Sequence, residues 1–200
     1  MYRYFNTCSN EDVVINFPTL YFMPQLNIGL SEEQRHGVID LLNKDLADQY
    51  LLIIKTKKYH WDVIGPAFRT LHTLWEEHYN TLTINIDATA ERVRQLGGYP
   101  LGTAAGFVQH STLKEHPNDL PSANVMVARL VQDHEQVIRN FRDHVDQCDK
   151  FHDQGTADFL TALMEQHEEM AWMLRSFLEG ESLDPSGRRV GEETKPAVNA

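Results

Sequence analysis

Apolar residues recur at intervals of three and four along most of this chain, which is the period of an amphipathic α-helix. The alternating pattern of a β-strand is nearly absent. Four long segments show the helical pattern: residues 31 to about 63, 66–96, 122–148 and about 156–180. We therefore predict an all-α protein, built as a four-helix bundle.

The ends of the first two segments carry residues that start and stop helices. Ser31 and Gln34 have the spacing of a capping box, which predicts the beginning of the first helix. Gly65-Pro66 breaks that helix, and Pro66 suits the first turn of the second one. Gly97-Gly98 ends the second helix. Both helices are thus bounded by signals in the sequence.

The connection between the second and third helices, residues 101–121, is too long for a tight hairpin. It contains glycine and proline, and we predict a short extra helix within it. Ser122 follows and can cap the third helix. Three parts result: an N-terminal arm at 1–30, a bundle domain at 31–180 and a flexible C-terminal tail at 181–200.

Composition narrows the class of protein. The chain has 200 residues, of which 42% are hydrophobic and 24% charged, as in one soluble globular domain. No apolar run approaches the roughly 20 residues of a membrane-spanning helix, and the first residues do not resemble a signal peptide. Cys8 and Cys148 are the only cysteines, too few for a disulfide framework. We therefore expect a cytoplasmic protein without a membrane partner.

A polar stripe follows the second helix beside its apolar one. His72 and Glu76 are four residues apart, and so are Asp87 and Glu91, so each pair shares a helix face. The fifteen residues from His72 to Asp87 return to nearly the same direction at about 100° per residue. A solvated face would also explain this pattern. The ten histidines and the net charge of −11 make cation binding the alternative.

Distance along the helix favours a site shared by two chains. Glu76 and Asp87 are roughly 16 Å apart along the axis, too far for one metal site. If two copies of this helix pack antiparallel across a two-fold axis, His72 and Glu76 of one chain face Asp87 and Glu91 of the other, twice per dimer. His60 precedes the bend by about a turn and falls at a similar height to His72. Two histidines and three carboxylates suit Fe(II), and bridging carboxylates could hold two metal ions.

These residues stand in a recognisable signature. Residues 60–68, HWDVIGPAF, followed by Leu71-His72, a carboxylate four residues on and the D-x-x-x-E of 87–91, resemble the signature of the Dps family of miniferritins. The fourth helix is also similar to that family, with His167-Glu168 and the AWMLR of 171–175. The resemblance covers about residues 31–180, and the combined spacing is highly specific.

The resemblance implies a ferritin-like bundle assembled as a hollow dodecamer. It implies ferroxidase centres at the two-fold interfaces, where Fe(II) is oxidised by hydrogen peroxide or dioxygen and Fe(III) is stored as mineral, which protects against oxidative damage. The di-iron ligands would be His60, His72, Glu76, Asp87 and Glu91. Zinc could compete at the same ligands. Position 76 departs from many relatives, which have Asp, so the arm that reaches the metal is longer here.

Three aspartates surround the start of the fourth helix: Asp149, Asp153 and Asp158. Helix capping and favourable placement near the helix dipole would explain them. In the family, this region lines three-fold pores, where three copies of each carboxylate would attract cations. We favour the pore interpretation, most strongly for Asp158.

Two other functions remain as alternatives. A DNA-coating structural protein is disfavoured, because residues 1–30 have one basic and two acidic residues and 181–200 have three basic and four acidic. An oxygen-carrying di-iron bundle resembling hemerythrin would need more histidines converging in one chain. The ordinary ferritin pattern, Glu-x-x-His on two helices, is absent from the sequence.

Residues outside the ligand set receive structural interpretations. Trp61 is expected to pack in the core, with electron donation as a secondary role. His134 and His167 lie on apolar stripes and are expected to be satisfied core histidines, and His78 is expected to point away from the site. Four other histidines are expected at the surface: His36, His110, His116 and His144.

Overall fold

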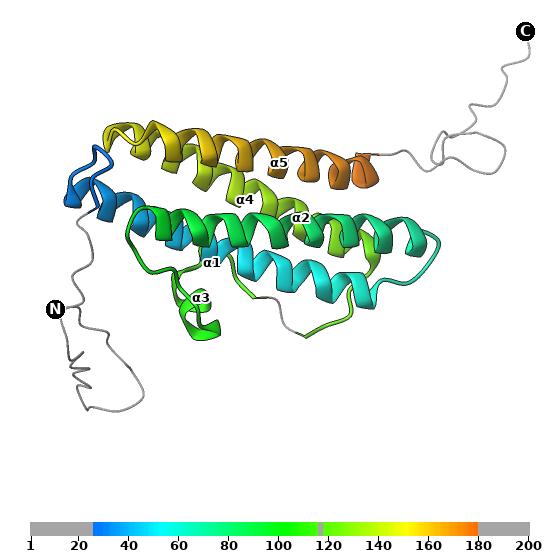
Figure 1. The fold of residues 1–200 in the computed structure, drawn as a ribbon. Helices are drawn as coiled ribbons and strands as arrows, with labels where there is room; N and C mark the ends of the chain where they lie inside the picture. The colour runs from blue at the N-terminus through cyan, green and yellow to red at the C-terminus, as the bar shows by residue number, and fades with distance from the viewer. Residues whose placement is uncertain (1–25, 116–117, 180–200) are drawn as a thin grey trace, which may run out of the picture.

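Five α-helices make up most of the residues that the computed structural model describes, 26–115 and 118–179 (Figure 1). The elements are α1 (Glu32–Asp62), α2 (Phe68–Gln95), α3 (Ala104–His110), α4 (Ala123–Lys150) and α5 (Gln154–Glu179). No strand occurs in these residues, so the all-α prediction is confirmed. The predicted tail 181–200 and all but the last five residues of the predicted arm 1–30 lie outside them.

The four long helices form two antiparallel hairpins (Figure 1). One hairpin consists of α1 and α2, the other of α4 and α5, and α1 also lies against α4. Between the hairpins the chain returns along the length of the bundle, and α3 packs on α1 within this connection. The predicted short helix between the second and third long helices is therefore confirmed. No helix in the described ranges is long and apolar enough to cross a membrane.

Local signals set most helix ends. The Ser31 hydroxyl accepts from the Gln34 backbone at 3.2 Å and the Gln34 side chain accepts from the Ser31 backbone at 2.8 Å, so the predicted capping box is confirmed. Gly97, with a φ of +84°, ends α2 in the left-handed region that glycine adopts without strain. One boundary was predicted wrongly: α2 begins at Phe68, because 65–67 form a separate turn around Gly65.

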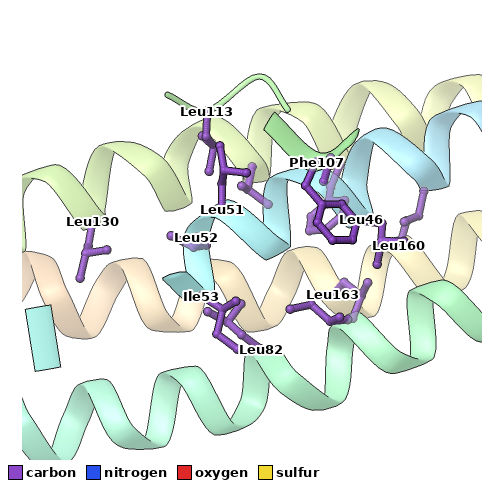
Figure 2. Close-up of a cluster of buried hydrophobic side chains, with 14 of the residues drawn as sticks. Leu46, Leu51, Leu52, Ile53, Leu82, Phe107, Leu113, Leu130, Leu160 and Leu163 are labelled. Carbon is purple, nitrogen blue, oxygen red and sulfur yellow. The ribbon is translucent and has the colours of Figure 1, made fainter. Parts of the chain in front are cut away.

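The core lies between the two hairpins and draws on every helix. Figure 2 shows Leu46 and Leu52 of α1, Leu82 of α2, Leu130 of α4 and Leu160 of α5. All five are completely buried. Burying one such side chain contributes about 1.5–3 kcal/mol, so the apolar stripes seen in the sequence supply most of the stabilisation.

A buried carboxylate fastens the connection between the hairpins to the bundle. Asp48 of α1 is 1% exposed. It accepts hydrogen bonds from the Thr112 backbone at 2.6 Å, from the Ser111 hydroxyl at 2.6 Å and from the Asn140 amide of α4 at 2.8 Å. A buried charge with several donors is well compensated. Asp48 therefore ties the connection to α1 and α4 at one point.

Candidate metal centre

Two histidines meet where the first hairpin turns. His60 lies in the last turn of α1 and His72 near the start of α2. Their rings stack with centroids 3.7 Å apart and 18° between the planes. His60 is 8% exposed and His72 is half-buried. The turn at 63–67 thus brings together two side chains that are twelve residues apart in the sequence.

Reciprocal hydrogen bonds fix the tautomer of both rings. His60 Nδ1 lies 2.7 Å from the carbonyl oxygen of His72, and His72 Nδ1 lies 2.8 Å from the carbonyl oxygen of His60. A carbonyl oxygen only accepts, so each Nδ1 must carry the hydrogen. In a neutral imidazole the Nε2 atom then keeps its lone pair, which is the form that binds a metal. Both histidines are therefore oriented as Nε2 ligands before any metal arrives.

The carboxylate of Glu76 stands one turn further along α2 and is exposed. Its Oε1 accepts a hydrogen bond from the Tyr79 hydroxyl at 3.3 Å. The Tyr79 ring lies edge-on to His60, with centroids 5.3 Å apart and an interplanar angle of 86°. Phe68 lies 5.1 Å from the His72 ring. Aromatic rings thus flank the histidine pair, and a carboxylate lies beside it.

The remaining two candidate ligands lie elsewhere on α2. Asp87 and Glu91 are exposed, and neither makes a hydrogen bond or ion pair within the described part of the chain. Within residues 26–115 and 118–179 of one chain, no group of three or more His, Cys, Asp or Glu side chains has the geometry to hold a metal ion. Of the five candidates, one chain brings only His60 and His72 into direct contact, with Glu76 joined to them through Tyr79. Asp87 and Glu91 lie further along α2.

The three aspartates near α5 differ in their surroundings. Asp153 is 4% exposed, caps α5 by accepting from the Thr156 backbone at 3.0 Å, and forms an ion pair with Arg92 at 3.2 Å. Its carboxylate is thus engaged within the chain, as the capping interpretation expected. Asp149 and Asp158 are exposed and remain available to line an opening.

Three histidines lie together in the core. His134 and His167 are completely buried, with their Nδ1 atoms 3.1 Å apart, and the His78 ring lies 6.0 Å from His134. Burial lowers the pKa of His78 to about 4 and that of His167 to about 3, and holds the pKa of His134 well below its usual value. All three are neutral at neutral pH.

The prediction that His134 and His167 are core residues is confirmed, but the prediction that they are satisfied is wrong for one nitrogen of each. Their Nε2 atoms, and both nitrogens of His78, have no hydrogen-bond partner among the described residues. The burial of His78 was missed. It lies three residues after Trp75 and four before Leu82, both completely buried, so helical spacing carried the signal.

Two predictions about burial, for His144 and Trp61, are wrong. His144 was expected at the surface, yet it is 8% exposed and its Nδ1 lies 2.8 Å from Asp45 Oδ1. Burial lowers its pKa, but the hydrogen bond and the charge of Asp45 outweigh this, so the pKa of His144 is raised. Trp61 was expected in the core but is 71% exposed in a single chain. His110 is exposed and His36 partly so, whereas His116 lies outside the described residues.

The four-helix fold, together with the histidines and carboxylates of the α1–α2 hairpin, is that of a ferritin-like protein. A family model described as a ferritin-like domain matches residues 39–183, and the chain belongs to that family. A low temperature-induced protein of Nostoc sp. strain PCC 7120 is 69% identical over 177 residues, covering 88% of this chain and 99% of the relative.

Within that class, the chain is a Dps-family miniferritin. DNA protection during starvation protein 1 of Deinococcus radiodurans is 36% identical over 155 residues, 78% of this chain and 75% of the relative. The structure of DpsC from Streptomyces coelicolor is similar with a TM-score of 0.78 and 30% identity, covering 80% of this chain and 94% of that one. A Dps protein from Vibrio cholerae O1, described as one of the ferritin-like diiron-carboxylate proteins, gives a TM-score of 0.73 and 28% identity over 78% of this chain and 98% of that one.

Proposed function

We propose that this miniferritin oxidises Fe(II) at centres shared by two chains and stores the Fe(III) as mineral inside a dodecamer. His60, His72 and Glu76 of one chain would bind iron together with Asp87 and Glu91 of a second chain. The observation that carries this proposal is the pair of reciprocal hydrogen bonds that occupies both histidine Nδ1 atoms and leaves Nε2 as the nitrogen that can bind a metal. One chain supplies only part of such a ligand set, so pairing would complete it.

Exposed apolar side chains on the same hairpin support pairing through this face. Trp61 is 71% exposed, Ile64 82%, Phe68 46% and Ile84 69%. Large apolar groups that gather around a polar site commonly mark an interface with another protein. A second copy of the chain is the partner that would cover them and also bring the missing carboxylates.

The chemistry follows from two irons held in one site. Each Fe(II) gives one electron to hydrogen peroxide, the O–O bond breaks, and two hydroxide ions form without release of a hydroxyl radical. Dioxygen is the alternative oxidant. The protein's part is to hold both ions close together and to offset their rising positive charge with three carboxylates. Zinc, which takes the same nitrogen and oxygen ligands, would compete without being oxidised.

Entry and location complete the proposal. Asp149 and Asp158 would line a three-fold opening and concentrate Fe(II) near it, because three copies of an acidic group focus the potential. The cytoplasm is the proposed compartment, since two cysteines supply no disulfide framework. The result for the cell would be protection from iron and peroxide together.

Mixed assemblies test the shared site directly. His72→Ala and Asp87→Ala homo-oligomers should each oxidise Fe(II) slowly. When the two variants are unfolded, mixed equally and reassembled, half of the dimers contain one of each chain, and each such dimer has one intact site of two. Activity should therefore return to about a quarter of the unmodified level. Stopped-flow oxidation with no recovery on mixing would refute a site shared between chains.

A further inference from the structure

Tyr79 contacts a histidine of one helix and a carboxylate of another. Its hydroxyl donates to Glu76 Oε1 at 3.3 Å, and its ring meets His60 edge-on at 5.3 Å. The Lys57 ammonium lies 5.0 Å from the centroid of the same ring. Lys57 and His60 are three residues apart on α1, so they share one face of that helix. The ring is thus held by α1 while its hydroxyl holds a side chain of α2.

Glu76, the side chain that Tyr79 holds, has more conformational freedom than the two histidines. Glu76 is exposed and carries one more methylene than the aspartate expected at this position, so its carboxylate can occupy more rotamers. His60 and His72 are already fixed by their backbone hydrogen bonds. A metal that binds all three must therefore restrict Glu76 most. A hydrogen bond formed beforehand reduces that cost.

We propose that Tyr79 is a positioning residue that places Glu76 for metal binding. The hydroxyl keeps Oε1 and leaves Oε2 for the ion, and the ring keeps Glu76 beside His60 across the two helices. This inference rests on the proposed function, since it requires His60 and Glu76 to be ligands. Removing a partner of this kind, which orients a ligand without touching the metal, typically weakens metal binding about 10–100-fold.

A second interpretation treats the contact as an ordinary surface hydrogen bond. In that case Tyr79 would contribute a little to folding and nothing to the metal. The two interpretations differ in one respect. If Tyr79 acts through Glu76, removing its hydroxyl matters only while Glu76 is present. If it acts through general packing, the effect is the same with or without Glu76.

The test is a double-mutant cycle on the assembled protein. Zn(II) binding would be measured by calorimetry, without oxidant, for the unmodified protein, Tyr79→Phe, Glu76→Ala and the double variant. Phenylalanine keeps the ring against His60 and removes only the hydroxyl. We expect Tyr79→Phe to weaken Zn(II) binding roughly tenfold, the lower end for such residues. In the Glu76→Ala background the same change should have no further effect.

Controls separate this inference from the proposed function. Tyr99→Phe serves as a matched control, because Tyr99 is 71% exposed and lies against Arg94 instead, and it should leave Zn(II) affinity unchanged. Unchanged affinity in Tyr79→Phe, or an equal loss in the Glu76→Ala background, would overturn the role of Tyr79. If His72→Ala binds Zn(II) as tightly as the unmodified protein, the proposed ligand set itself is wrong.

Discussion

Acid should destabilise this protein through the three histidines in its core. The pKa of a histidine in an unfolded chain is about 6.5. In the folded chain, burial lowers the pKa of His78 to about 4 and of His167 to about 3, and places that of His134 well below normal. Between pH 6.5 and 5 the unfolded chain therefore takes up protons that the folded chain does not. The folded state loses stability as the pH falls through this window.

The magnitude follows from proton linkage. For a histidine that stays neutral in the folded chain, the free energy of unfolding falls by about 1.4 kcal/mol per pH unit below 6.5. At pH 5 the loss is roughly 2 kcal/mol each for His78 and His167, whose folded-state pKa values lie below 5. His78 and His167 together therefore account for about 4 kcal/mol, and the lowered pKa of His134 acts in the same direction; the total stability of a typical domain is about 5–15 kcal/mol. His144 acts in the opposite direction, because its raised pKa favours the folded state in acid. A variant is needed to isolate the core histidines.

Urea unfolding of His167→Leu and of the unmodified protein, at pH 7 and pH 5 and at one fixed protein concentration, isolates this effect. The variant should lose about 2 kcal/mol less than the unmodified protein between the two pH values. His110→Leu, at an exposed position, should follow the unmodified protein. An equal loss of stability in His167→Leu and the unmodified protein would show that this buried histidine does not titrate as its surroundings require.

Three further predictions concern entry, partners and packing. Asp158→Asn should slow iron uptake at low salt and leave the oxidation step intact; uptake equal to the unmodified protein in a core-loading assay would remove this residue from the entry path. With a net charge of −11, the protein should leave duplex DNA unshifted in a gel titration at moderate ionic strength, and a salt-sensitive shift at micromolar protein would contradict this. Gly37→Ala places a methyl group against the Phe151 ring and should cost about 1–3 kcal/mol in urea unfolding; a loss under 0.5 kcal/mol would mean that the ring moves aside.

Helix positions and ends were readable from the sequence because their causes are local. The capping box at Ser31 involves residues three apart, and the glycine that ends α2 acts on its own backbone. The beginning of α2 was misjudged because proline suits either a helix start or a preceding turn. Its true position depends on how the hairpin closes, which no short segment encodes.

Contacts between distant residues explain the remaining errors. His144 pairs with Asp45, ninety-nine residues away. No sequence pattern close to either residue predicts this contact. The spacing of His60 and His72 predicted that they would lie at similar heights. It did not predict that each Nδ1 would donate to the other's backbone, because that bond depends on the shape of the turn between them. The residue types therefore suggested the chemistry, whereas the three-dimensional structure was needed to show which nitrogen of each histidine is free to bind a metal.

The two hairpins carry different proposed functions, iron binding on one and iron entry on the other. Every proposed iron ligand lies on the α1–α2 hairpin, whereas the exposed aspartates Asp149 and Asp158 lie on the α4–α5 hairpin. The link between them is long, and Asp48 fastens it near the middle of α1. A substitution that changes how fast Fe(II) enters therefore need not disturb the proposed iron ligands. Substitutions confined to Asp149 and Asp158 should therefore alter the uptake rate and leave the ligand set as it was, so the two properties can be engineered independently within one shared core.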